Sequence, residues 1–213
     1  MKNSADYRNV ARGNLKNNWG TAVLVCIIIA GISTILSFIP YIGSVVSLLL
    51  CGQLAVGEIM YFIKLHNKQD ARVGSIFEGF GENWINNLLT YLLQTIYIIL
   101  WSLLLIIPGI IKSYAYSMTM YLKAKQPNLT SNEAISKSQQ IMDGKKWKLF
   151  CLQLSFIGWA ILSIFTFGIG FLFLMPYMQS STIAFYEDAY NAYQQVKEPD
   201  LSADDEIVIE DNN

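Results

Sequence analysis

The chain has 213 residues, of which 53% are hydrophobic and only 15% are charged, and its mean hydropathy is +0.35. Soluble proteins carry about 25% charged residues, so the composition excludes an ordinary soluble domain, and the same low charge excludes a disordered chain. One His and three Cys leave few ligands for a metal site. The formal net charge of -1 hides a very uneven distribution of charge along the chain.

Charged side chains are missing from three long segments. The segments lie between Lys16 and Glu58, between Glu82 and Lys112, and between Lys148 and Glu187. A helix needs roughly 20 apolar residues to cross about 30 Å of hydrocarbon. The first and third segments are therefore long enough for two spans each, with breaks at 38–43 and 166–170 that contain Pro or Gly.

The sequence thus predicts an all-α polytopic membrane bundle rather than a water-soluble apolar core. Six hydrophobic helices are expected at about 20–38, 44–63, 84–107, 110–124, 148–167 and 171–187. The turn between the third and fourth is expected at Pro108-Gly109. The fourth helix is the shortest, and it is compatible with a short span, a tilted span or a helix that enters from the protein interior.

A period of about 64 residues divides residues 1–190 into three units, at about 4–64, 75–124 and 130–190. Trp19, Trp84 and Trp147 lie 65 and 63 residues apart, and each is followed by a turn glycine, Gly43, Gly109 or Gly170. Each Trp also follows a short segment with helix signals, and two of these segments, at 75–78 and 130–133, match a capping box. A true parallel repeat of an amphipathic helix plus a helical hairpin explains this better than the rough spacing of any six-span protein.

Lys and Arg gather between the predicted hairpins and not in the hairpin turns. Residues 2–16 carry four cations, residues 64–72 carry three and residues 123–148 carry six. The positive-inside rule then places both termini and the amphipathic helices on the cytoplasmic side of a plasma membrane. The three repeated Trp side chains are expected to anchor that interface, and the basic helices are expected to contact anionic headgroups of the bilayer.

The end of the chain is acidic. Residues 1–186 carry fourteen cations and seven acids, whereas residues 187–213 carry one cation and nine acids. We expect residues 191–213 to be an acidic cytoplasmic tail, mostly disordered from about 198. A solvated tail without a partner, a tail that binds a basic protein, and a tail that folds back on the basic inner face are all compatible with this composition.

Few residues could carry chemistry. Glu58 and Lys112 lie within predicted spans, where ionisable groups suggest function, but both are off-centre and compatible with structural roles. With Tyr114 and Tyr116 they form a candidate intramembrane polar site. The cysteines Cys26, Cys51 and Cys151 are expected to be reduced and buried, and no catalytic, metal-ligating, cofactor-binding or phosphate-loop motif is present. We therefore expect a protein that is not an enzyme, has no cofactor and does not bind nucleic acid.

Several short stretches form a recognisable set: LKNNW at 15–19, IPGIIKSYAYSM at 107–118, NEAISKS at 132–138, MDGKKWKLF at 142–150, FIGW at 156–159, FGIG at 167–170 and PY at 176–177. Together they resemble a bacterial integral membrane family known only as domain of unknown function 975. The resemblance covers about residues 4–190. It implies a six-span helical protein of the plasma membrane, and it supplies no substrate and no catalytic residue.

Three functions remain open at this level. The first is a non-enzymatic accessory or regulatory protein that binds a partner through the basic inner face or the acidic tail. The second is a small transporter or lipid-handling protein with a path between the repeats near Lys112 and Glu58. The third, an intramembrane enzyme, is the weakest because no nucleophile is placed beside a base.

Overall fold

The computed structural model describes residues 2–38, 42–166 and 168–197, and these residues form helices without any strand. Ten are α-helices: α1 (Ser4–Leu15), α2 (Trp19–Ser37), α3 (Ile42–His66), α4 (Trp84–Leu104), α5 (Ile106–Ala115), α6 (Thr119–Lys125), α7 (Ser131–Met142), α8 (Lys146–Leu154), α9 (Ile157–Phe165) and α10 (Ile169–Lys197). One further element, η1 (Val73–Phe80), is a 3₁₀-helix. The predicted all-helical class is confirmed.

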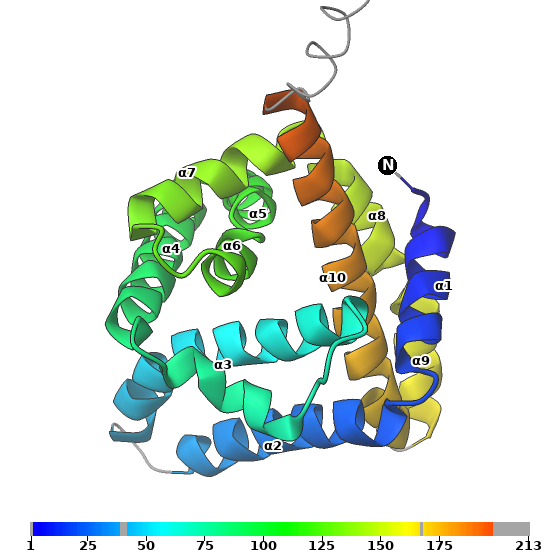
Figure 1. Ribbon diagram of the computed structural model, residues 1–213. Helices are drawn as coiled ribbons and strands as arrows, with labels where there is room; N and C mark the ends of the chain where they lie inside the picture. Colours follow the sequence, from blue (N-terminus) through cyan, green and yellow to red (C-terminus); the bar gives the residue numbers. More distant parts are fainter. Residues whose placement is uncertain (1, 39–41, 167, 198–213) are drawn as a thin grey trace, which may run out of the picture.

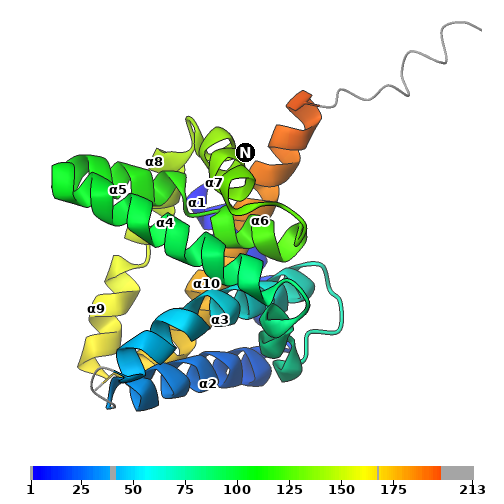
Figure 2. The ribbon, with the colours of Figure 1, turned by 90° about the vertical axis from the view of Figure 1, so that its left-hand side faces the viewer.

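Within the described residues, three stretches are long and apolar enough to cross a membrane. They are α2, α4 and the combined run of α8 and α9 from Lys146 to Phe165. Their outer surfaces are apolar as well, because large hydrophobic side chains stay exposed around the α4–α5 connection and at the end of α9, for example Leu103 at 82% and Phe165 at 78%. In Figure 2 the α4–α5 connection and the end of α9 both lie on the left of the molecule, and the last turns of α10 point away from them.

The predicted break between the first two hydrophobic helices is confirmed, since α2 ends at Ser37 and α3 begins at Ile42. The break in the third segment is also confirmed, since α9 ends at Phe165 and α10 begins at Ile169. The predicted turn at Pro108-Gly109 is wrong. The chain turns at Leu105, whose backbone is extended. Pro108 lies in the first turn of α5, where its missing N–H costs no hydrogen bond.

A glycine brings the two helices of each later hairpin close together. A Cβ on Gly109 would lie 2.3 Å from Ser102 Oγ, and a Cβ on Gly170 would lie 2.6 Å from Ser163 Oγ. Both pairs are separated by the same seven positions in the sequence. The corresponding contact of Gly43, in the first hairpin, lies outside the part of the structure that is described.

Two predicted helices are interrupted. The helix expected at 110–124 is divided into α5 and α6, and the helix expected at 148–167 is divided into α8 and α9. At each break a serine hydroxyl bonds a helix carbonyl oxygen: Ser117 Oγ donates to Tyr114 O at 2.9 Å, and Ser155 Oγ donates to Leu152 O at 2.6 Å. Such side-chain bonds compete with the backbone ladder and favour a bend.

The short segments before the three Trp residues differ from one another. The capping box at Thr130 is confirmed, because its hydroxyl accepts from the Glu133 backbone N–H. The capping box expected at Ser75 is wrong, because η1 begins after Arg72 without a side-chain cap and Ser75 instead accepts a bond from Lys64. The 3₁₀ segment packs directly on the backbone of α3, where a Cβ on Gly57 would lie 1.8 Å from the Ile76 carbonyl oxygen.

Helix α1 is part of the protein core. Figure 1 shows it running beside α10, and its apolar stripe of Tyr7, Ala11 and Leu15 is buried. Tyr7 Oη donates to Asp188 Oδ2 at 2.6 Å. Burial acts to raise the pKa of Asp188, but the hydrogen bonds from Tyr7 and from the Lys2 backbone amide outweigh burial and hold that pKa below its usual value. The stripe therefore faces protein and is not available to the bilayer.

The predicted boundary between bundle and tail at residue 190 falls inside a helix. α10 continues to Lys197, and its residues Ala189 and Tyr190 belong to the buried core. The remainder of the predicted acidic tail, residues 198–213, lies outside the described residues.

Candidate functional site

Glu58 lies at the wall of a cavity of about 690 Å³. The cavity is bounded by residues of α2, α3, α8, α9 and α10, so the first and third of the sequence units both contribute to it. The Glu58 carboxylate oxygen Oε1 accepts a hydrogen bond from Gln179 Nε2 at 3.0 Å. It makes no ion pair within the described part of the chain.

A second amide connects this cavity to the middle unit. Gln153, at the end of α8, lines the cavity, and its Oε1 accepts a hydrogen bond from Tyr114 Oη at 2.7 Å. The Tyr114 ring also packs edge-on against Phe150 at 6.0 Å between centroids. The cavity wall is therefore tied to α5 by the Tyr114–Gln153 bond, although no residue of α5 lines the cavity.

Lys112 and Tyr116 lie elsewhere. Lys112 Nζ lies over the Trp101 ring, 4.8 Å from its centroid, and 5.9 Å from that of Tyr116. Tyr116 is buried with Ala115 and Ile135 in a small core of its own. The structure thus brings Glu58 and Tyr114 to one site through Gln153, and it leaves Lys112 as the cation of an aromatic cluster within the α4–α5 hairpin.

The three repeated Trp residues begin their helices. Trp19 and Trp84 are the first residues of α2 and α4, and Trp147 is the second residue of α8. Trp19 is half-buried and packs against Phe173 at 6.1 Å, whereas Trp84 is 46% exposed and Trp147 is 71% exposed. The Trp19 ring packs on α10, the Trp147 ring packs on Phe150 of its own helix, and Trp84 accepts a bond from Gln53 of α3 at its backbone carbonyl oxygen. The three positions are therefore not structurally equivalent.

A buried ion pair joins α6 to α10, and sequence reasoning missed it. Lys125 Nζ lies 2.6 Å from Glu187 Oε2, donates to Tyr121 Oη at 3.0 Å and lies 4.5 Å from the centroid of the Tyr190 ring. Lys123 beside it is fully buried and donates to the backbone carbonyl oxygens of residues 127 and 129. The available signals were Glu187, the acid that ends a charge-free segment, and Tyr121 and Lys125, which lie four residues apart. Neither one indicates that positions 62 residues apart meet.

The model of a protein family, described as Protein of unknown function (DUF975), matches residues 1–112 and again residues 103–192. The chain belongs to this family. No curated protein and no solved structure matches the chain. The two matches overlap at residues 103–112, and the second ends at residue 192, inside α10 of this DUF975 member.

The Glu58 cavity offers a ligand one carboxylate, a hydrogen-bond acceptor, together with the side-chain amides of Gln153 and Gln179. A carboxylate that lacks a cationic partner favours a bound ammonium or a hydroxyl donor. Within the described residues no three His, Cys, Asp or Glu side chains gather as a metal site would require. The rest of the lining is mostly apolar and includes Phe171, Leu174, Met175 and Met178, with Thr182 and Tyr186 as its hydroxyl-bearing residues.

Proposed function

We propose that this chain is a multi-pass protein of a bacterial plasma membrane, with six spans arranged as three parallel hairpin repeats and both termini in the cytoplasm. Three observations support this placement. Exposed apolar side chains gather on the hairpins, the cations lie between the hairpins, and the family model matches twice. The close Ser–Gly contact in both later hairpins supports the repeat.

We further propose that the protein handles an amphiphile at the Glu58 cavity and performs no chemical step on it. The observation that carries this proposal is the hydrogen-bonded but unpaired Glu58 carboxylate at the wall of a mostly apolar cavity of about 690 Å³. An ionisable group inside a membrane protein is costly and marks a functional pathway by default. The matching ligand has a positively charged or hydrogen-bond-donating head and an apolar chain.

Thermal unfolding of the full chain in detergent micelles tests this function. Dodecylammonium is the probe, and dodecanol is the uncharged probe of the same chain length. At ten times its dissociation constant a ligand stabilises by about 1.4 kcal/mol, so dodecylammonium is expected to raise Tm by about 3–6 °C. Glu58→Gln removes the charge with little change in shape and is expected to abolish the rise, whereas Lys112→Ala preserves it. An equal rise with dodecanol, or an undiminished rise in Glu58→Gln, contradicts the proposal.

An accessory role through a basic inner face is the second candidate. Lys16, Lys68 and Lys148 are exposed and make no ion pair within residues 2–38, 42–166 and 168–197. Such cations attract anionic headgroups or an acidic segment within a Debye length. If the acidic tail acts there, deletion of residues 198–213 is expected to change the phenotype of a strain that produces the chain. Deletion without effect counts against the tail as a docking element.

A further inference from the structure

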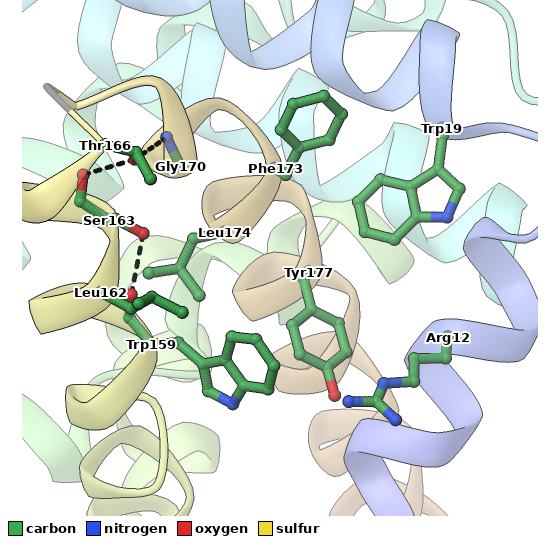
Figure 3. A pocket seen from close by; sticks show the side chains of 10 residues that line it. All are labelled: Arg12, Trp19, Trp159, Leu162, Ser163, Thr166, Gly170, Phe173, Leu174 and Tyr177. Atoms are coloured by element: carbon green, nitrogen blue, oxygen red, sulfur yellow. Dashed lines mark hydrogen bonds between the residues drawn. The ribbon is translucent and has the colours of Figure 1, made fainter.

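A second cavity, of about 320 Å³, lies between α9 and α10 and reaches α1 and the start of α2. Figure 3 shows its lining side chains. Arg12 and Tyr177 lie at one end, and Ser163 and Gly170 lie toward the other. Leu174 lines both cavities, whereas Glu58, Gln153 and Gln179 line only the larger one. One end of the cavity offers hydrogen-bond donors and the other is apolar, and this contrast indicates which class of ligand fits.

The first end offers two hydrogen-bond donors that lack acceptors. The Arg12 side chain is exposed, lies 5.6 Å from the centroid of the Tyr177 ring and has no carboxylate partner within the described residues. Tyr177 is only 7% exposed, and its hydroxyl is buried without a hydrogen-bond partner. Figure 3 shows that hydroxyl directed toward the Arg12 guanidinium. A buried hydroxyl without a partner costs free energy, and a bound anion would satisfy it.

The other end is apolar. Leu162, Phe173 and Leu174 line it, and the indole of Trp159 covers one side. The two hydroxyls there are already used. Ser163 Oγ donates to Trp159 O at 2.8 Å, and Thr166 Oγ1 donates to Ser163 O at 2.8 Å and accepts from Gly170 N at 3.0 Å. This end therefore offers contact only to a hydrocarbon group.

We propose that this cavity binds one anionic phospholipid. Its phosphate accepts hydrogen bonds from the Arg12 guanidinium and the Tyr177 hydroxyl, and one of its acyl chains lies along α9 and α10. A guanidinium fits phosphate oxygens in a bidentate arrangement. Leu162 is 55% exposed, so the apolar end opens to the surrounding lipid. Trp19 lines the cavity beside Arg12, at the depth where an indole prefers the interface.

The site rests on the membrane placement proposed above and not on the Glu58 cavity. The two proposals are separable because Glu58→Gln leaves every residue of the lipid site in place. Arg8 provides a matched control one turn earlier on α1, since its guanidinium donates to the Ser155 carbonyl oxygen and does not line the cavity.

Native mass spectrometry of the full chain in detergent micelles tests the proposal. The chain is titrated with phosphatidylglycerol, with phosphatidylcholine of the same acyl chains, or with glycerol 3-phosphate. One phosphatidylglycerol is expected to bind about tenfold or more tightly than phosphatidylcholine. Arg12→Gln is expected to lower the affinity for phosphatidylglycerol about tenfold, because a charge-assisted hydrogen bond is lost. Arg8→Gln and Glu58→Gln are expected to leave it unchanged.

Two further variants keep the test decisive if Arg12→Gln does not fold. Tyr177→Phe removes only a hydroxyl without a partner, so it preserves the fold and lowers affinity several-fold. Leu162→Trp adds bulk at an exposed position of the apolar end and blocks both phospholipids. Equal binding of the two phospholipids overturns the proposal. An equal loss of phosphatidylglycerol affinity in Arg8→Gln and Arg12→Gln also overturns it, because that result would indicate general attraction of the anionic lipid to basic side chains. Glycerol 3-phosphate that competes as well as the whole lipid indicates a plain anion site and also overturns it.

Discussion

Loss of the cation in the buried pair between α6 and α10 is expected to destabilise the protein strongly. The side chain of Glu187 is 8% exposed and that of Lys125 is 29% exposed, with 2.6 Å between Nζ and Oε2. The second carboxylate oxygen of Glu187 is buried without a hydrogen-bond partner. Lys125→Met would therefore leave an uncompensated charge in the core. Removing one partner of such a pair costs about 3–5 kcal/mol.

In a chain of this length each kcal/mol shifts Tm by about 2–4 °C, so Lys125→Met is expected to lower Tm by about 6–20 °C. The measurement is thermal unfolding of the purified chain in detergent micelles. The double variant Lys125→Met with Glu187→Leu removes both charges and is expected to recover most of the loss, because well-packed apolar replacements of buried pairs are often neutral. A single variant as stable as the parent, or a double variant no better than the single one, refutes the reasoning.

Three other outcomes are expected. Gly57→Ala in α3 places a Cβ 1.8 Å from a backbone carbonyl oxygen of η1 and is expected to lower the free energy of unfolding by about 1–3 kcal/mol. The control Gly74→Ala, in η1, meets no atom within 4 Å and is expected to leave Tm unchanged. The pKa of Asp188 is lowered from 3.8 in the folded chain, so the stabilisation that its carboxylate gives to the contact of α1 with α10 is fully present above about pH 4 and is lost as the pH falls through that lower value. Hydrogen exchange of the α1 amides is expected to speed up there, and Tyr7→Phe is expected to abolish most of this dependence. A fluorescent-protein reporter fused after Asn213 is expected to fold and fluoresce on the cytoplasmic side, and a reporter found outside the cell contradicts the orientation.

Helix positions followed closely from the pattern of charge and hydrophobicity. The long charge-free segments predicted α2, α3 and α4 to within a few residues. The prediction was poor at the breaks between α5 and α6 and between α8 and α9. Ser117 and Ser155 bond helix carbonyl oxygens at these breaks, but Ser113 makes the same kind of bond inside α5 without ending the helix. Neither average hydropathy nor the presence of a serine therefore marks where these helices are interrupted.

The candidate site was only partly predictable. Glu58 was recognised because an acid in an apolar segment is rare, but its partner Gln179 and the lining residue Gln153 were not. Their convergence on one cavity depends on how α3, α8 and α10 pack. Lys112 carried the same sequence signal as Glu58, yet it lies against Trp101 in a different part of the fold.

The sequence by itself determined that the chain is helical and apolar, where its charges lie and which family it resembles, because these follow from local composition and spacing. Tertiary structure decided which polar groups meet. The Lys125–Glu187 pair, the Glu58–Gln179 bond and the end of the second cavity formed by Arg12 and Tyr177 each join residues more than 60 positions apart. The physical reason is that burying a charge or hydroxyl without a partner costs free energy, but the sequence does not show which helix, if any, supplies that partner.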